Sequence, residues 1–236
     1  MSAERKVVIV TGASQGIGAG LVKAFSERDY RVVANSRSIK PSDDPDVLAV
    51  AGDISKPETA KLVVDEAMRR FGRIDSLINN AGIFIGKRFP DYTEADFIKM
   101  LSVNLAGFFY ITQGAIAEMA RQGSGHIVNI TTTLADQANS KSPSALASLT
   151  KGGLNSVVKS LAIEYASRGV RVNAVAPGVI KTPMHGAEKY EALAKFHPLG
   201  RMGEISDIVD AVLYLESAGF VTGEILHVDG GQSAGH

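Results

Sequence analysis

Thr11-Gly12-Ala13-Ser14-Gln15-Gly16-Ile17-Gly18 is the segment from which the architecture of this chain can be worked out. It follows the apolar run Lys6–Val10 and leads into a helical repeat at Ile17, Leu21, Phe25 and Arg28. Glycines at such a strand–helix junction permit a tight turn, and phosphates can then sit on the positive helix N-terminus. The spacing Gly-x3-Gly-x-Gly differs from the commoner Gly-x-Gly-x-x-Gly, and an ordinary glycine turn is the alternative. The strand before and the helix after favour phosphate binding.

Outward from this loop, short β-branched runs alternate with segments of helical spacing. The predicted strands are Lys6–Val10, Arg31–Ala34, Val47–Val50, Ser76–Asn79, His126–Ile130, Val170–Val175 and Ile225–Val228. Thr93 with Asp96 predicts the start of a long helix that runs to about Arg121, and a second helical repeat runs from Leu154 to Tyr165. Such alternation predicts a doubly wound α/β fold, with about seven parallel strands and helices on both faces in three layers.

Composition limits the classes of protein that this chain can belong to. It has 236 residues, with 25 Lys+Arg against 25 Asp+Glu, so no basic field indicates nucleic acid or an anionic membrane as a partner. It has no cysteine, which excludes disulfides and thiolate chemistry, and the five histidines show no metal-binding spacing, so we expect no metal site. No repeat or linker divides the chain, so residues 1–236 are predicted to form one domain. The apolar run before Gly12 is too short for a secretory or membrane segment, and we expect a cytoplasmic protein.

Several further motifs occur in one order along the chain. They are Gly52-Asp53-Ile54, Asn79-Asn80-Ala81-Gly82, Val103-Asn104, Pro177-Gly178 with Thr182, Thr222-Gly223 and Val228-Asp229-Gly230-Gly231. With the glycine loop, they make the chain resemble the classical short-chain dehydrogenase/reductases over almost its whole length. The resemblance implies a Rossmann-type fold, a nicotinamide dinucleotide cofactor, hydride transfer between that cofactor and a carbonyl or alcohol, and a substrate lid at about residues 183–200.

The resemblance also assigns cofactor contacts to residues of this sequence. Asp53 and Ile54 would contact the adenine, Asn80, Ala81 and Gly82 the middle of the cofactor, and Ile180 and Thr182 the nicotinamide carboxamide. Asp53, Asn79 and Asn80 can equally be explained as turn residues, and the two roles are compatible. The complete set of predicted cofactor-binding residues is Gly12, Ser14, Gln15, Gly16, Ile17, Gly18, Ser36, Arg37, Asp53, Ile54, Asn80, Ala81, Gly82, Lys151, Pro177, Gly178, Ile180 and Thr182.

The end of the second predicted strand indicates which dinucleotide is preferred. An NAD site needs a carboxylate there for the ribose 2′-hydroxyl, and a 2′-phosphate would repel that carboxylate. Ser36 stands at this position and Arg37 follows it. Because the guanidinium group suits phosphate in charge and in geometry, we expect NADP(H) to be preferred over NAD(H). The alternative is that Arg37 is a solvated loop residue.

One catalytic position of the family is altered. Members use a Tyr-x-x-x-Lys motif, in which the tyrosine donates a proton and the lysine holds the ribose and lowers the pKa of the phenol. Here the lysine falls on Lys151 and the tyrosine position on Ala147. The family's serine falls on Thr132, fifteen residues before Ala147, which indicates a two-residue insertion, and its asparagine falls on Asn104. The predicted catalytic residues are therefore Asn104, Thr132 and Lys151.

Other groups could replace the missing phenol. The candidates are Lys151 acting with a water, which we favour, and Ser144, His185, Tyr190 or His197. The chain is thus expected to be an NADP(H)-dependent oxidoreductase acting on a small carbonyl or alcohol substrate with a non-standard proton donor. The alternatives are a non-catalytic NADP(H)-binding protein, either a redox sensor or a scaffold subunit, and a non-redox enzyme on the same fold. The resemblance further implies a homotetramer or homodimer assembled through the helices after Thr93 and Ser144.

Overall fold

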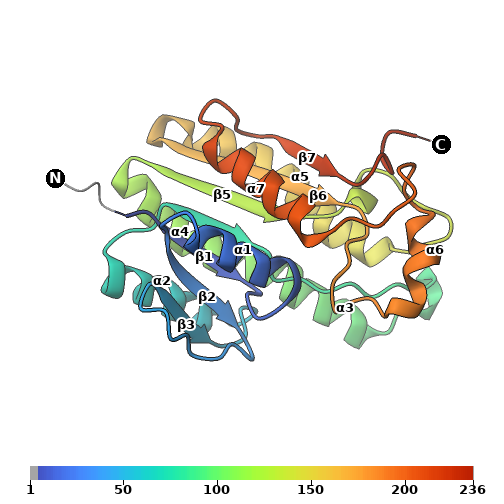
Figure 1. The fold of residues 1–236 in the computed structure, drawn as a ribbon, viewed down its shortest axis with the longest axis horizontal. Coiled ribbons are helices and arrows are strands. Elements are labelled where there is room, and N and C mark those ends of the chain that lie inside the picture. The colour runs from blue at the N-terminus through green and yellow to red at the C-terminus, as the bar shows by residue number, and fades with distance from the viewer. Residues whose placement is uncertain (1–4, 236) are drawn as a thin grey trace.

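The computed structural model describes residues 5–235, which form one parallel sheet in the order β3-β2-β1-β4-β5-β6-β7 (Figure 1). The strands are β1 (Val7–Thr11), β2 (Arg31–Ser36), β3 (Val47–Ala51), β4 (Ser76–Asn79), β5 (Gly125–Ile130), β6 (Val170–Pro177) and β7 (Ile225–Val228). The predicted doubly wound sheet is confirmed, and each predicted strand is present with ends shifted by at most two residues. The strand order reverses between β1 and β4, and such a switch point opens a crevice at the carboxyl ends of the strands.

Helices cover both faces of the sheet, which explains why the strands are almost continuously apolar. The helices are α1 (Gly16–Ser26), α2 (Pro57–Phe71), α3 (Glu94–Met100), α4 (Gly107–Gln122), α5 (Ala145–Tyr165), α6 (Tyr190–Ala194) and α7 (Ile205–Ser217). One buried cluster joins the sheet to α2, α4 and α5, and a second joins it to α1 and α7. Figure 1 shows α1 and α7 crossing in front of the sheet, and α3 and α6 beyond the arrowheads of the strands.

The helix predicted from Thr93 to about Arg121 is present but contains an irregular turn. A capping box between Thr93 and Asp96 starts α3, and a π-helical turn over Leu101–Ala106 joins α3 to α4. By length and composition, the continuous helix Glu94–Gln122 would be apolar enough to cross a membrane. In this fold the apolar side of α4 packs into the core beneath the sheet instead. The π turn was not predicted, and it carries the buried residue Asn104.

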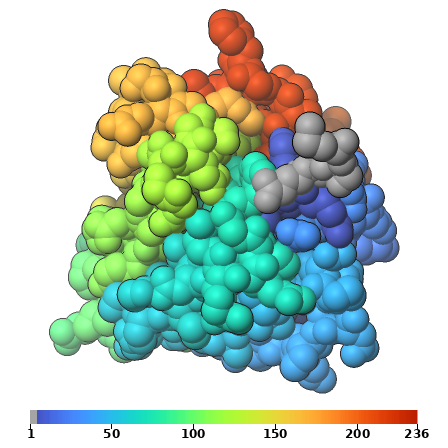
Figure 2. All heavy atoms as spheres, turned by 90° about the vertical axis from the view of Figure 1, so that its left-hand side faces the viewer, coloured from blue at the N-terminus to red at the C-terminus, as the bar shows by residue number. Residues whose placement is uncertain are grey.

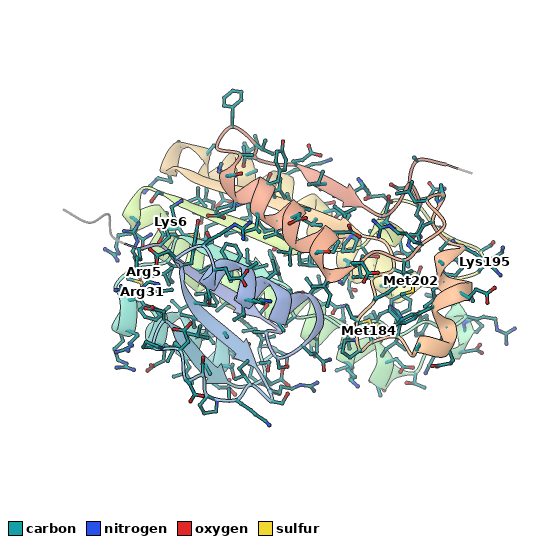
Figure 3. The ribbon with its side chains drawn as sticks, in the orientation of Figure 1. Arg5, Lys6, Arg31, Met184, Lys195 and Met202 are labelled. Atoms are coloured by element: carbon teal, nitrogen blue, oxygen red, sulfur yellow. The ribbon has the colours of Figure 1, made fainter. Side chains whose placement is uncertain are left out.

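The amino and carboxyl ends of the strands are covered by different kinds of segment. At the amino ends of the strands, the segments before β4, β5 and β6 lie together: Gly125 N–H donates to Gly169 O at 3.2 Å, and Ile74 N–H donates to the Gln122 side chain at 2.9 Å. Figure 2 shows this face, closed by segments far apart in the sequence. At the carboxyl ends lie the glycine loop and the segment from 183 to 200, which contains a short 3-10 helix, Ala187–Lys189, and α6. Figure 3 labels Met184 and Met202 at this second end, and Arg5, Lys6 and Arg31 at the first.

Candidate active site

The glycine loop between β1 and α1 brings backbone amide groups to the carboxyl edge of the sheet. Gly12 has a φ of +65°, and a Cβ at Gly18 would lie 2.2 Å from the Gly12 carbonyl oxygen. Neither position therefore accepts a larger residue. No side chain caps α1 at Gln15, which leaves the amide groups of the first helical turn available to a ligand. The loop has the shape and the donors that a pyrophosphate site requires.

Two polar side chains that join β1 to β4 hold this loop in place. Thr11 Oγ1 accepts hydrogen bonds from the backbone N–H groups of Asn80 at 3.1 Å and Ala81 at 3.0 Å. Asn80 Nδ2 donates to the carbonyl oxygens of Thr11 at 2.9 Å and Gly12 at 3.2 Å. Asn80 therefore stabilises the loop, in addition to being a predicted cofactor contact. Thr11 was not predicted as a site residue, although a polar residue at the end of a buried strand is a signal that could have found it.

A cavity of about 540 Å³ extends from this loop along the carboxyl ends of the strands, within the size range of ligand pockets. Of the predicted cofactor-binding residues, all but Gly18 line it; Gly18 packs against Gly12 behind the loop. Thr132 and Ala147 also line it, whereas Asn104 lies outside. The other lining residues are Asn35, Ser38, Gly52, Ile83, Phe84, Lys99, Val103, Ile130, Thr131, Leu134, Ser142, Val179, Pro183, Met184, His185, Leu193 and Phe196.

Asn35 and Ser36 line the cavity at the carboxyl end of β2, and each has a buried polar atom without a protein partner. Asn35 Nδ2 donates to Val50 O at 2.9 Å, but Asn35 Oδ1 and the buried Ser36 Oγ have no hydrogen-bond partner. Arg37 and Asp53 line the same end. Partial burial raises the pKa of Asp53, but hydrogen bonds from Ser55 and the charge of Arg37 outweigh this, so its pKa lies below the ordinary value. This end can therefore receive a ligand that both accepts and donates hydrogen bonds.

Lys151 occupies the middle of the cavity. Its Nζ donates to the carbonyl oxygens of Ile130 at 3.2 Å and Thr131 at 3.0 Å. Burial lowers the pKa of Lys151 to about 8. Ala147 lies one helical turn before it on α5, is 1% exposed and offers no polar side-chain atom to the cavity. On α5, Lys151 is thus the titratable residue nearest to Ala147, which stands at the position of the family's tyrosine.

Asn104 is fixed by hydrogen bonds behind the cavity wall. Its Oδ1 accepts from Ile83 N–H at 2.9 Å, and its Nδ2 donates to Ile83 O and to Thr150 Oγ1, each at 3.1 Å. Thr150 Oγ1 in turn donates to Leu146 O at 2.8 Å. Thr150 is a second residue that was not predicted, and it connects Asn104 to the backbone of α5.

A second, enclosed cavity of about 10 Å³ connects Asn104 with Lys151. It is also lined by Asn79, whose Oδ1 has no hydrogen-bond partner, and by Ile54. This volume matches one water molecule, and the surrounding polar atoms can bind one. The predicted catalytic residues Asn104 and Lys151 therefore meet at a water-sized space behind the cavity wall.

The three consecutive threonines after β5 have different partners. Thr131 Oγ1 donates to Val175 O at 3.3 Å, and Thr133 Oγ1 donates to Asp229 Oδ2 at 2.7 Å. Thr132 Oγ1 accepts from Leu134 N–H at 3.3 Å, which leaves its own proton free for a ligand. Among the three threonines, Thr132 thus has a hydroxyl proton that no other described residue accepts, and its role as a substrate donor stays a prediction.

The segment from 183 to 200 forms the far wall of the cavity. Met184, His185, Leu193 and Phe196 line it, whereas Tyr190, His197 and Ser144 do not. Of the side chains considered as substitutes for the phenol, His185 and Lys151 therefore reach the cavity. Burial, assisted by the charge of Lys189, lowers the pKa of His185.

Comparison with known protein families supports a specific relationship. Residues 12–233 match a family model described as enoyl-(acyl carrier protein) reductase. The chain is 36% identical to carbonyl reductase family member 4 of Xenopus laevis, over 96% of this chain and 97% of the relative. It is 35% identical to L-fucose dehydrogenase of Bos taurus, over 98% and 90% of the two chains. It is 34% identical to a 3-oxoacyl-(acyl-carrier-protein) reductase of Thermotoga maritima, over 98% and 99%.

Solved structures show the same architecture. ElxO with NADP bound superposes with a TM-score of 0.92 at 28% identity, covering 98% of this chain and all of ElxO. A 3-ketoacyl-(acyl-carrier-protein) reductase from Brucella melitensis complexed with NADH gives 0.89 at 32% identity, covering 98% of this chain and 100% of that one. Together with the glycine loop and the cavity that leads from it to Lys151, these likenesses place the chain in the short-chain dehydrogenase/reductase family, whose members are oxidoreductases that bind a nicotinamide dinucleotide.

Proposed function

We propose that this chain reduces apolar carbonyl compounds with NADPH, and that Lys151 with a water replaces the family's tyrosine as the proton donor. The observation that carries the proposal is the hydrogen bonding of Lys151. A lysine ammonium has three N–H donors, and the Ile130 and Thr131 carbonyls occupy two of them. The third is free to face a ligand or a water in the cavity that Ala147 also lines.

The residues around the cavity fit a dinucleotide with a 2′-phosphate. The free amide groups of the first turn of α1 suit a pyrophosphate. The guanidinium of Arg37 suits a 2′-phosphate, and the residue at the end of β2 is Ser36 rather than a carboxylate that would repel it. Ile180, Thr182 and Lys151 would hold the nicotinamide riboside. ElxO was solved with NADP and the Brucella reductase with NADH, so the preference for NADPH rests on Ser36 and Arg37.

The remaining groups can complete the reaction. NADPH, when bound, supplies the hydride to the carbonyl carbon. Thr132 donates a hydrogen bond to the carbonyl oxygen, and Lys151, protonated at neutral pH, provides the proton through a water. A positioned general acid contributes about 10² to 10⁴-fold, or roughly 3–5 kcal/mol of the barrier. Since positioning the two reactants can contribute as much or more, the chain should be a slow but genuine reductase.

The substrate end of the cavity favours an apolar molecule. Its side chains are largely hydrocarbon: Ile83, Phe84, Leu134, Met184, Leu193 and Phe196. A sugar would need a polar partner for each of its hydroxyl groups, and few are present. The space left by the phenol at Ala147 also accommodates a bulkier group beside the carbonyl. We therefore favour apolar ketones, aldehydes or quinones over the sugars named for some relatives.

Single-turnover kinetics test this function. Excess protein is mixed with NADPH and a panel of apolar ketones, aldehydes and quinones, and the loss of NADPH absorbance is followed. We expect slow transfer to at least one of them, abolished by Lys151→Met, which retains the side-chain length without the charge. Ala147→Tyr should raise the rate for small ketones by 10²-fold or more. Ala147→Phe is the matched control, because it fills the same space without an acidic proton and should not raise the rate.

Ala147 also motivates a second candidate function, a non-catalytic NADP(H)-binding protein. In that case the wild type binds NADPH but transfers no hydride to any panel member, and Lys151→Met changes binding alone. Failure of both NADP(H) and NAD(H) to bind would contradict both functions.

We further propose that the chain assembles as a homotetramer or homodimer in the cytoplasm. Large apolar side chains lie exposed on the outer faces of α4 and α5, at Phe109, Leu149 and Ile163. An exposed apolar surface of this kind is typical of a contact between subunits.

A further inference from the structure

His197 lies at the carboxyl end of the segment from 183 to 200 and contacts the backbone of the turn after β6. Its side chain is 4% exposed, and its Nε2 accepts a hydrogen bond from the backbone N–H of Val179 at 2.9 Å. Val179 stands between Gly178 and Ile180, two residues that line the nicotinamide end of the cavity. A residue outside the cavity thus holds part of the cavity wall.

The position of the imidazole ring is fixed by backbone on two sides. A Cβ at Gly178 would lie 2.7 Å from His197 Nε2, so the ring fits only because residue 178 is glycine. A Cβ at Gly230 would lie 3.1 Å from His197 Cβ, and Gly230 O accepts from Leu199 N–H at 3.1 Å. The ring therefore cannot shift far without moving the turn at Gly178 or the segment after β7.

Backbone groups make the other hydrogen bonds of this turn. Gly178 N–H donates to Val228 O at 3.1 Å, Gly203 N–H donates to Val179 O at 3.0 Å, and Lys181 N–H donates to Gly203 O at 2.9 Å. For Val179 N–H, the hydrogen bond found among residues 5–235 is the one to the histidine. The amide group at the centre of the turn is thus held by a titratable side chain.

The bond to Val179 requires an unprotonated Nε2. Burial lowers the pKa of His197, and the charge of Arg201 acts in the same direction. The carbonyls of Ala194 and Leu193 and the carboxylate of Asp229 oppose it. Arg201 is paired with Asp207 at 2.7 Å. The Asp229 carboxylate accepts hydrogen bonds from Thr133 Oγ1 at 2.7 Å, Ser233 N–H at 2.9 Å and Gly231 N–H at 3.0 Å. The lowered pKa favours the neutral ring at neutral pH, and Nε2 becomes a donor only when the ring is protonated in acid.

We propose that His197 is a positioning residue: neutral, it holds the Val179 turn in the shape that receives the nicotinamide, and its protonation releases the turn and the end of the segment from 183 to 200. In the protonated ring an N–H would face the N–H of Val179, and two donors cannot bond to each other. Dinucleotide affinity should therefore fall as the pH falls. This inference rests on the proposed dinucleotide binding.

The test compares His197→Gln with His197→Phe. The glutamine Oε1 can replace Nε2 as an acceptor and does not titrate, whereas phenylalanine fills the space without an acceptor. For each variant, NADPH affinity and the hydrogen-exchange protection of the Val179 amide are measured between pH 7.5 and 5.5. His227→Gln is the matched control, because it removes an exposed histidine that does not line the cavity.

In the wild type and in His227→Gln, we expect NADPH affinity and Val179 protection to fall together as the pH falls, by up to about tenfold, which is the limit over this range for a single histidine whose pKa is lowered from 6.5. His197→Gln should reduce this dependence to the part caused by the cofactor's own phosphate, which all variants share. His197→Phe should bind weakly and leave Val179 unprotected at every pH. Identical pH profiles for the wild type and His197→Gln, or full Val179 protection in His197→Phe, would overturn the inference. If NADPH binds to no variant, the proposed function fails, while Val179 protection in the free protein still tests the role of His197.

Discussion

At the scale of single residues, the protonation state of Lys151 should set the pH dependence of the reaction. Burial lowers its pKa to about 8, so the ammonium form predominates below that pH and is lost above it. If this group supplies the proton, the single-turnover rate of carbonyl reduction should be level below about pH 7. It should fall by up to tenfold per pH unit above about 8. The rate of alcohol oxidation should change in the opposite direction.

Stopped-flow rates at saturating NADPH between pH 6 and 10 measure this profile. Lys151→Arg keeps a charge that does not titrate in this range and should remove the decline, whatever its absolute rate. A reduction rate that rises with pH would exclude Lys151 as the donor.

The predicted site residues and the missed ones differ in how far along the sequence their hydrogen-bond partners lie. The glycine loop and Lys151 belong to local motifs, in which spacing alone indicates the role. Thr11 and Thr150 were missed, and His197 was considered only as a substitute for the phenol. These three residues act through partners 69, 46 and 18 residues away. Such pairings depend on the register of strands and helices, which a single sequence does not specify. The orphaned atoms of Ser36 and Asn79 likewise emerge only from the packed structure.

At the scale of elements, the contact between α1 and β1 depends on the absence of a side chain at Gly18. A Cβ there would lie 2.2 Å from Gly12 O and 2.7 Å from Asn80 Nδ2. Gly18→Ala should therefore displace the start of α1, lower the free energy of unfolding by about 1–3 kcal/mol and abolish NADPH binding. Urea denaturation and fluorescence titration measure these two effects.

Gly153→Ala is the matched control within helix α5. A Cβ at Gly153 would have nothing within 4 Å, so alanine should raise the free energy of unfolding by about 0.5–1 kcal/mol. Equal effects of the two substitutions would mean that the packing of α1 on β1 does not require glycine.

The elements were predictable to the extent that their periodicity is regular. All seven strands follow from apolar, β-branched runs, and the start at Thr93 follows from its capping pattern. The π turn at Leu101–Ala106 has no periodic signature, because a single wide turn spans too few residues to show a period of its own. Arg28 was included in the helical repeat of α1, but the helix ends at Ser26, since Asp29 takes a left-handed conformation with φ of +63°.

At the scale of the whole molecule, a buried polar network at the amino ends of the strands should make stability depend on pH. His126 Nδ1 contacts Glu216 Oε2 at 2.7 Å, and its Nε2 contacts Asn173 Nδ2 at 3.0 Å. Glu216 also accepts from Ser76 Oγ at 2.8 Å and Tyr30 OH at 3.2 Å. The network connects β4, β5, β6 and α7.

Burial lowers the pKa of His126 despite the neighbouring Glu216 carboxylate. The folded state therefore resists a proton that the unfolded chain accepts at its ordinary pKa of about 6.5. The stability from neutral His126 is complete above this pH and is lost as the pH falls below it, by up to about 1.4 kcal/mol per unit. Urea unfolding between pH 7.5 and 5 should show this decline.

The pKa values of His185 and His197 are also lowered, so the comparison must separate three histidines. The double variant His185→Gln/His197→Gln should retain the part of the slope that belongs to His126. A free energy of unfolding of this double variant that stays constant from pH 7.5 to 5 would contradict the lowered pKa of His126 in the folded protein.

The π turn at Leu101–Ala106 has a consequence for any variant in which Glu94–Gln122 is made into a regular α-helix. Successive residues of an α-helix are rotated by about 100°. Deleting one residue to convert Glu94–Gln122 into an unbroken α-helix would therefore turn α3, with Lys99, about a quarter of the way around its axis relative to α4. Asn104 could then no longer reach the Ile83 backbone while Ile111 and Ala115 kept their places in the core. The irregular turn therefore sets the rotation of α3 relative to α4, and an uninterrupted α-helix would place one of them wrongly.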